Sequence, residues 1–315
     1  MKKLFIESLS AGMDLLNEPF LLEDVSLRTT RDDRPFLLFK LRDKTGQIGA
    51  VYWDVPAHVQ PLAANGAVRL VTGQVVVYRD ALQINVTDLN PTSTADLTDF
   101  LPASSRPQTE MLAELDEHIA SLGQPWQQLV ATLLAEPFRS RFADAPAART
   151  MHHAYIGGLL EHTISMATLA DRLADHYPSV RRDLLVTGTL LHDMGKVIEY
   201  DIQAGIGFSE DGRLVGHIIR AIVMIETAAA AIDIDEDDLR QLVHLIASHH
   251  GKAEWGAPVE PKTIEAVLLH QLDLLDSRVQ GFFDHLQREQ RNGRWTQNNS
   301  YMFNTELMYP NDWDE

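Results

Sequence analysis

The chain has 315 residues, of which 45% are apolar, so it is long enough for two domains with sizeable cores. It contains no cysteine, which excludes disulfides, thiolate zinc sites and a cysteine nucleophile. The net charge of −18 argues against a general polyanion binder, because phosphate contacts need lysine and arginine.

The sequence shows no export or membrane segment. No apolar run approaches the roughly 20 residues needed to cross a bilayer, and Glu7 interrupts the short apolar run before it too early for export. We therefore expect a soluble, cytoplasmic protein. Residues 1–90 carry 10 basic against 11 acidic side chains, and the remainder carries 17 against 34. If the chain binds nucleic acid, the near-neutral N-terminal part is the better docking surface.

Residues 1–90 predict a small β-barrel. Asp43-Lys44-Thr45-Gly46 is a strong hairpin signal. A helical stretch is expected near 55–64. About five short strands suit a closed barrel better than an open sheet, because closure removes exposed edges. The expected strands are 20–26, 36–42, 47–53, 68–78 and 82–86.

The strand at 36–42 combines aromatic and basic side chains, which is how barrels of this kind stack bases and follow a nucleic-acid backbone. Alternation points Leu37, Phe39 and Leu41 into the core. For any single aromatic side chain, burial is the better expectation. The opposite face supplies the candidate substrate-binding residues Phe36, Lys40 and Arg42.

Residues 91–108 are rich in Pro, Ser and Thr and predict an interdomain linker. From residue 109 to 315 the pattern is helical, with apolar residues at three- and four-residue spacing. The predicted fold class is therefore multidomain β + α: a five-stranded barrel at 1–90 and an all-α domain at 109–315. The expected helices are 111–122, 126–135, 154–176, 181–192, 214–231, 237–249 and 263–286.

Thirteen histidines is a high count, and several lie at inward or helix-terminal positions, one of them next to an aspartate. A buried polar group is costly without a partner, and imidazole with carboxylate is the ligand set of Zn, Fe, Mn or Co. A lone histidine on an apolar face is usually a core residue. The prediction of a metal site therefore rests on the ordered set of His and Asp residues. In chain order the set is His162, His192 with Asp193, His217, His249 with His250, and Asp273.

This ordered set resembles the HD superfamily of metal phosphohydrolases. The stretches 152–162, 248–251 and 269–276 resemble the YhaM-type 3′→5′ exoribonucleases, which join an N-terminal OB-fold to a C-terminal HD domain. The resemblance covers nearly the whole chain. It implies one ion held by His162, His192, Asp193 and Asp273, and a second held by His217, His249 and His250, with Asp193 bridging. The HD-GYP group carries Gly-Tyr-Pro where this chain has Trp255-Gly256-Ala257-Pro258, which weakens a cyclic-dinucleotide function.

Two divalent ions, with Mn, Co or Fe favoured over Zn or Mg, would generate a nucleophile from water and offset charge on the phosphoryl oxygens. Asp193 and Lys196 are the candidate catalytic residues. Lys196 is either a positive charge for the phosphate or a solvated lysine at a helix end. His153 and Tyr155 are candidates for lining the substrate path, and packing against the catalytic helix is an equal alternative for Tyr155.

We expect a metal-dependent 3′→5′ exonuclease that hydrolyses single-stranded RNA to mononucleotides, with DNA as an open alternative. The 3′ polarity comes from the resemblance alone. A second hypothesis is a nucleotide or cyclic-nucleotide phosphohydrolase with a regulatory OB domain, although a small-molecule enzyme has no need of the barrel. A non-catalytic binding module is disfavoured by the complete ligand set. Oligomeric state stays open, and a homo-oligomer is one option.

Overall fold

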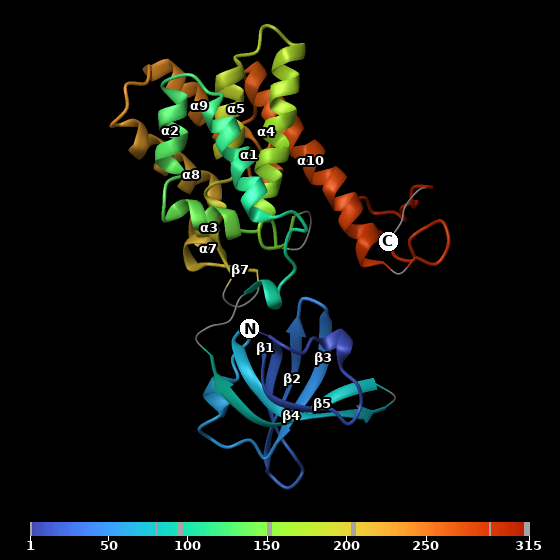
Figure 1. Cartoon of the computed structure of the whole chain (residues 1–315). Coiled ribbons are helices and arrows are strands. Elements are labelled where there is room, and N and C mark those ends of the chain that lie inside the picture. Colours follow the sequence, from blue (N-terminus) through green and yellow to red (C-terminus); the bar gives the residue numbers. More distant parts are fainter. Residues whose placement is uncertain are drawn as a thin grey trace. The chain divides into compact units, whose positions relative to one another are not determined.

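The computed structural model describes residues 2–79, 81–92, 97–149, 153–202, 206–289 and 291–311 (Figure 1). Its contacts divide the chain into two compact units, Met1–Ala103 with Asp201–Gly207, and Ser104–Tyr200 with Phe208–Glu315. Residues 93–96 of the predicted linker and His152 of the stretch at 152–162 lie outside the described residues. Within the described part of the chain, no helix has both the length and the apolar character that crossing a membrane demands.

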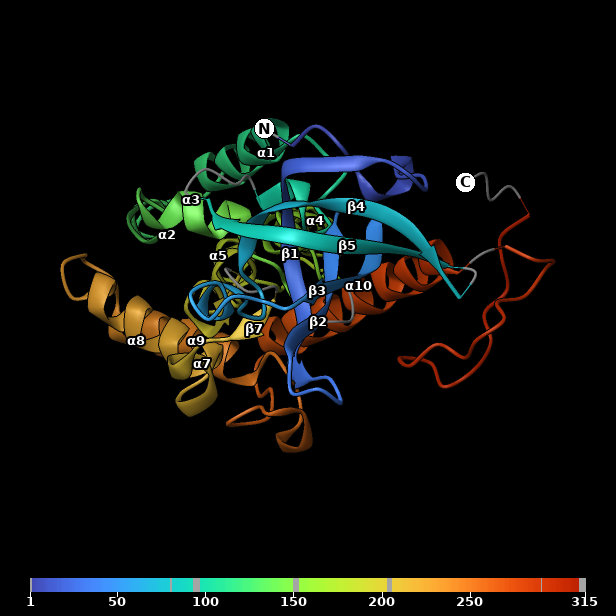
Figure 2. The same ribbon diagram turned by 90° about the horizontal axis from the view of Figure 1, so that it is seen from below.

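The N-terminal unit contains five strands: β1 (Asp14–Thr29), β2 (Pro35–Asp43), β3 (Gly46–Trp53), β4 (Val68–Tyr78) and β5 (Ala81–Pro91). They form a closed barrel in the order β1-β2-β3-β5-β4. β3 and β5 pair in parallel, and the other neighbours pair antiparallel. Figure 2, seen from below, shows β4 and β5 running across β1 and β2. The predicted five-stranded barrel is confirmed.

β1 is longer than the predicted strand at 20–26 because it pairs with both β2 and β4. Its register shifts once against each partner, around Asn17 for β4 and around Asp24 for β2. Both residues have positive φ, 52° and 53°. Such bulges bend a strand and increase its twist. Two bends therefore allow one continuous strand to close the barrel.

Burial along β2 alternates strictly, which confirms the predicted faces. The core side chains Leu37, Phe39 and Leu41 are each at most 2% exposed. On β3, Trp53 is 52% exposed and extends the outer face of β2. The outer face of β2 is half-buried or exposed and carries Phe36, Lys40 and Arg42.

The C-terminal unit is helical, and its apolar faces form one core. Its helices are α1 (Gln108–Ala120), α2 (Trp126–Leu133), α3 (Phe138–Asp144), α4 (Gly158–His176), α5 (Arg182–Leu191), α6 (Lys196–Glu199), α7 (Glu210–Leu214), α8 (His217–Ala229), α9 (Glu236–Ser248) and α10 (Ile264–Arg288). α4 packs against α1, α3, α5 and α10, and α5 also packs against α2 and α9. All seven predicted helices are present, with ends displaced by at most four residues.

Several short elements depart from the sequence prediction. The pattern misses α3, α6, α7 and the hairpin of β6 (Tyr200–Asp201) and β7 (Gly207–Phe208), because each is too short to show an apolar period. The small helical stretch expected near 55–64 is limited to a 3-10 helix at Gln60–Leu62. Pro61 within it has no N–H to donate, and no α-helix forms there.

The chain after α10 is not helical, in contrast to the all-α expectation for this region. Residues 291–311 form an irregular segment in which Ser300 and Thr305 pair as an isolated antiparallel bridge. Leu307 and Tyr309 pack with Leu286 of α10 in a small core of their own. This core anchors the segment on the last turns of α10.

The barrel core gives a stability prediction. Leu22 of β1 is fully buried, whereas Leu16 of the same strand is 75% exposed. We expect Leu22→Ala to lower the free energy of unfolding by about 2–5 kcal/mol, because it removes buried methyl groups and leaves a cavity. The matched variant Leu16→Ala should change it by less than about 0.5 kcal/mol. Urea unfolding of both full-length variants measures the difference, and equal losses would contradict the assigned face.

Candidate metal centre

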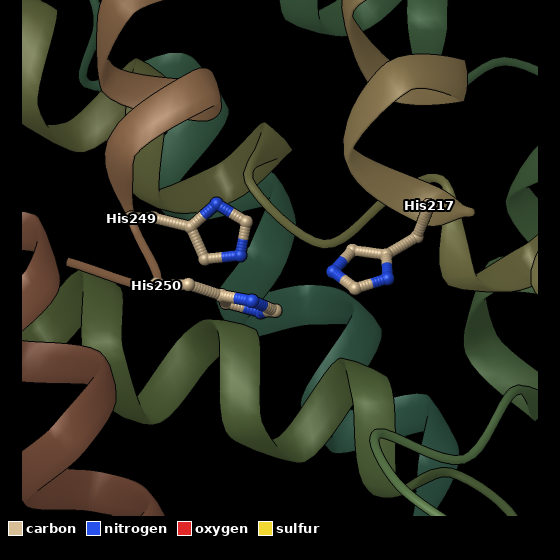
Figure 3. Close-up of side chains that lie close together, drawn as sticks. All are labelled: His217, His249 and His250. Atoms are coloured by element: carbon tan, nitrogen blue, oxygen red, sulfur yellow. The ribbon is translucent and has the colours of Figure 1, made fainter. Parts of the chain in front are cut away.

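The ends and faces of several helices bring the predicted ligands together. His192 and Asp193 directly follow α5, His217 opens α8, and α9 is followed by a histidine pair. Figure 3 shows His217 and that pair, His249 and His250, with their rings side by side. α4 contributes one further histidine and α10 one aspartate. The cluster, in full, comprises His162, His192, Asp193, His217, His249, His250 and Asp273.

Asp193 lies at the centre of this cluster and is only 2% exposed. Its Oδ2 is 3.3 Å from Nε2 of His192 and 3.8 Å from Nε2 of His162. Its Oδ1 is 3.5 Å from Nε2 of His217 and 3.6 Å from Nε2 of His249. Each carboxylate oxygen therefore faces its own pair of imidazoles.

The two remaining members extend the cluster on either side. Oδ1 of Asp273 is 3.4 Å from Nε2 of His162. The ring of His250 lies 4.4 Å from that of His249 and 5.2 Å from that of His217, between centroids. Burial lowers the pKa of His250 to about 3, and the two neighbouring histidines act in the same direction. His250 is therefore neutral and keeps a lone pair for a metal ion.

Hydrogen bonds at Nδ1 orient the imidazoles. Because a carbonyl or carboxylate oxygen only accepts, each of these Nδ1 atoms carries a proton, and in the neutral imidazole the lone pair is then on Nε2. Such bonds behind a metal-binding histidine fix its tautomer and its ring orientation. The bonds run from His192 to Thr189 O (2.8 Å), from His249 to Ile246 O (2.7 Å), from His250 to Trp255 O (2.8 Å) and from His217 to Glu199 Oε2 (2.9 Å).

Four buried atoms of the cluster have no hydrogen-bond partner among the described residues: Nε2 of His192, His217 and His249, and Oδ1 of Asp193. Leaving one such atom unsatisfied costs about 1–3 kcal/mol. Two ligand atoms, each about 2.1 Å from one ion, lie roughly 3.0–3.4 Å apart in octahedral or tetrahedral geometry. The separations around Asp193 are close to these values, so the residues fit a divalent metal ion.

The cluster keeps its carboxylates ionised. Burial alone would raise the pKa of Asp193, but the charge of Lys196 holds it well below its usual range. Burial alone would also raise the pKa of Asp273. The hydrogen bond and the charge of His162 outweigh burial, so the pKa of Asp273 is lowered. Both carboxylates therefore stay ionised, which is the state that a metal ligand needs.

Lys196 is buried, not solvated. It is the first residue of α6, its side chain turns inward, and the residue is only 8% exposed. Its Nζ donates to Oδ2 of Asp193 at 2.6 Å. Burial lowers the pKa of Lys196, but the charge of Asp193 outweighs burial and raises it above its usual range. The alternative of a solvated helix-end lysine is therefore wrong, while its phosphate contact stays a prediction.

Asp276 orients His162 from behind. Its Oδ2 accepts from Nδ1 of His162 at 2.7 Å and from Nε2 of His153 at 3.0 Å. Nδ1 of His153 lies 2.8 Å from the hydroxyl of Tyr155, which donates to Glu161. His153 is only 2% exposed. The two predicted substrate contacts, His153 and Tyr155, thus lie in a buried network behind His162, and contact with substrate stays a prediction for both.

Gly195 lets α8 approach the loop that carries Asp193. A Cβ on Gly195 would lie 2.1 Å from the carbonyl oxygen of His217, so any side chain there would push α8 away. Glu199 then holds His217 twice, accepting from its backbone N–H at 3.2 Å and from Nδ1 at 2.9 Å. Sequence reasoning missed Glu199, because nothing in its neighbourhood along the chain shows which histidine it meets.

A pocket of 450 Å³ opens beside the cluster. His250 and Asp273 contribute to its lining, and Trp255, Arg278 and Tyr301 are among the other lining residues. The pocket therefore touches both ends of the cluster. A small ligand in it would lie next to the candidate metal ligands.

The predicted barrel residues are each engaged with a neighbour on the barrel. Phe36 packs against Trp53, with ring centroids 4.8 Å apart. Lys40 and Arg42 form ion pairs of 2.9 and 2.7 Å with acidic residues of β1. Such surface pairs contribute little stability. Trp53, outside the predicted set, offers the larger exposed ring.

Comparison with known proteins assigns the family. Two family models match: an OB-fold nucleic acid binding domain over residues 24–92 and an HD domain over 159–278. The protein named 3'-5' exoribonuclease YhaM from Bacillus subtilis (strain 168) is 36% identical over 249 residues, which cover 78% of this chain and 79% of that protein. The chain belongs to the YhaM family. YhaM of Geobacillus sp. (strain WCH70) is 35% identical over 262 residues, covering 82% of this chain and 81% of that protein.

The matched ranges agree with the fold of this YhaM-family chain. The OB-fold range begins within β1 and ends after β5, and the HD range contains every candidate ligand. HD-domain proteins bind divalent metals, and the His and Asp groups of this chain suit that chemistry. The solved HD domain of the L. monocytogenes phosphodiesterase PgpH is 19% identical and covers 46% of this chain and 74% of that one. Its TM-score is 0.27, so it adds nothing to the assignment.

The role of Asp276 gives a prediction for metal affinity. Asp276→Asn removes the charge that orients His162, so we expect Mn²⁺ to bind about 10- to 100-fold more weakly. Titration calorimetry with Mn²⁺ measures this. Asp171→Asn is the matched control, because Asp171 is an ion-paired carboxylate on α4 whose partners are His118 and Arg182. Unchanged Mn²⁺ affinity in a natively folded Asp276→Asn protein would contradict the positioning role.

Proposed function

We propose that this YhaM-family chain is a metal-dependent 3′→5′ exonuclease that hydrolyses single-stranded RNA to mononucleotides. The observation that supports this most strongly is the set of buried, unpaired Nε2 atoms around Asp193. The matched relatives carry the name 3'-5' exoribonuclease. Single-stranded DNA is a second polymer that the same site would accept, and a cytoplasmic location is part of the proposal.

We assign two divalent ions to the cluster. The first would be held by His162, His192 and Asp273, the second by His217, His249 and His250, and Asp193 would bridge them. The arrangement of Asp193 supports this, because Oδ2 faces the first group and Oδ1 the second. Bound ions supply a nucleophile from water at neutral pH and offset charge on the phosphoryl oxygens. Imidazole with carboxylate suits several transition metals, and we propose Mn, Co or Fe ahead of Zn or Mg.

The chain's own residues have separate tasks in this proposal. Asp193 stays ionised in a buried site and is placed for two ions. Lys196 neutralises part of that charge and is a positive charge for a substrate phosphate. His250 stays neutral because burial lowers its pKa. Asp276 holds His162 with Nε2 toward the cluster.

The barrel is proposed to bind the single strand. Trp53 and Phe36 form a pair of packed rings on the outer face of β2 and β3. Lys40 and Arg42 lie on the same face of β2. Aromatic rings that stack bases, beside cations that follow the backbone, are how OB-folds bind unpaired strands. Stacking is tolerant of sequence, so little base preference is expected.

Asp193→Asn tests the centre of the proposal. Asparagine keeps the shape of the side chain but loses the charge, and only one of its two side-chain terminal atoms is an oxygen. We expect hydrolysis of a single-stranded oligoribonucleotide with Mn²⁺ to fall by more than about 100-fold, since orienting residues alone are worth 10- to 100-fold. Initial rates measure this, and circular dichroism confirms the fold. A rate close to that of the unaltered chain would refute the assignment of Asp193.

A closed circular strand tests the need for an end. We expect linear single-stranded RNA with a free 3′ end to be degraded to mononucleotides, and the same sequence closed into a circle to resist. Duplex RNA should also resist, because it offers neither unpaired bases nor a flexible backbone. Gel analysis of labelled strands measures all three. Rapid cutting of circles would show endonuclease action, and preference for free nucleotides would favour the nucleotide phosphohydrolase hypothesis.

A further inference from the structure

The 450 Å³ pocket beside the cluster has a composition that the metal chemistry alone does not explain. Small-molecule sites measure about 300–1,000 Å³ and combine apolar or aromatic walls with a few polar groups. This pocket adds Trp255, Tyr301, Leu274 and Met302 to the candidate ligands His250 and Asp273. Its size suits one nucleotide unit of a polymer.

Tyr301 is an aromatic side chain displayed on an anchored turn. It is 91% exposed. The turn is fixed on both sides of it, because Ser300 donates its backbone N–H to Thr305 at 2.8 Å and accepts from Asn304 at 2.7 Å. The next aromatic residue, Phe303, packs against Phe282 of α10 with centroids 5.8 Å apart. The fold therefore holds the tyrosine ring in water at the edge of a pocket that lies beside the metal cluster.

Trp255 supplies a second aromatic ring, tied directly to a candidate ligand. The residue is 46% exposed, and its carbonyl oxygen accepts from Nδ1 of His250 at 2.8 Å. The loop that orients His250 thus also places the indole in the pocket. Lys252 lies with Nζ 5.0 Å from the centre of the indole ring, and its charge is paired with Glu254 at 3.5 Å.

Arg278 supplies a cation to the same pocket. It lies on α10 one turn after Leu274, and it forms no ion pair with any residue that the structure describes. The C-terminal part of the chain is acidic overall, so Arg278 places a positive charge in the pocket against that background. An arginine in this position suits a phosphate, which it binds through a planar fork of N–H groups.

We propose that this pocket binds the terminal nucleotide of the strand, with the base against Trp255 and Tyr301 and a phosphate near Arg278. The inference rests on the proposed exonuclease function and deepens it. Base stacking on an aromatic ring works for every base, since each has a π face. The pocket would hold the last nucleotide at the cluster while the bond before it is cut, which also explains release of one nucleotide at a time.

A strand with an abasic ribose at its 3′ end tests the pocket. On the Mn²⁺-loaded full chain, we expect kcat/KM for an oligoribonucleotide ending in adenosine to exceed that for its abasic counterpart by about 5- to 150-fold, as for one stacked base. In Tyr301→Ala and in Trp255→Ala this ratio should fall toward one. Tyr301→Phe keeps the ring and should keep the ratio.

Tyr177→Ala is the matched control, because Tyr177 is also an exposed tyrosine, 46% accessible, at the end of α4. It should leave both rates and their ratio unchanged. The proposal is overturned if the unaltered chain cleaves both ends equally well. It is also overturned if Tyr301→Ala and Trp255→Ala keep the full preference for the adenosine end.

Calorimetric titration with adenosine 5′-monophosphate separates failure of the pocket from failure of the exonuclease function. We expect the Mn²⁺-loaded chain to bind it and Tyr301→Ala to bind it at least about 5-fold more weakly. If no oligomer is degraded but this difference holds, the exonuclease proposal fails and the nucleotide pocket stands. If the two proteins bind it equally, or neither binds it, the pocket assignment fails whatever the nuclease assays show.

Discussion

The carboxylate of Asp193, buried among four imidazoles, is the constraint on which the helical unit depends. An ionised carboxylate in a protein interior is costly unless charges and hydrogen bonds compensate it. Lys196 supplies one full compensating charge, at 2.6 Å. The four nearby Nε2 atoms lie 3.3–3.8 Å away, each turned toward an Asp193 oxygen. Divalent ions in this space would bind the lone pairs of the Nε2 atoms and of the Asp193 oxygens at once. The arrangement is therefore typical of a metal centre and not of an apolar core.

The helices serve this centre mainly through their ends. α5 and α9 each finish with a histidine whose Nδ1 bonds to a carbonyl of its own last turn, so the helix end itself sets the ring orientation. α8 begins with His217 against Gly195, where no side chain fits. Buried carboxylates then secure two of the rings, Asp276 for His162 and Glu199 for His217. These hydrogen bonds set the ring orientations of the candidate ligands.

The sequence predicted the barrel, the seven long helices and the identity of the clustered side chains, because apolar periodicity and the ordered His and Asp set are local signals. It missed what depends on contacts between distant segments. Glu199 meets His217 only because a hairpin returns the chain, and the helical stretch expected near 55–64 is limited to a 3-10 helix that contains Pro61. The sequence allowed Lys196 to be either a charge in the site or a solvated lysine, because its position at a helix end does not reveal that its side chain turns inward. Tyr301 had no periodic context at all, since its segment is irregular.

The central claim is that Asp193 bridges two ions. Anomalous diffraction from crystals of the full-length chain grown with Mn²⁺, collected on both sides of the manganese absorption edge, tests it most directly. The account predicts two manganese peaks, one beside His192 and His162 and one beside His217 and His249, with one oxygen of Asp193 on each. A single peak, or peaks that leave Asp193 without a metal contact, would contradict it.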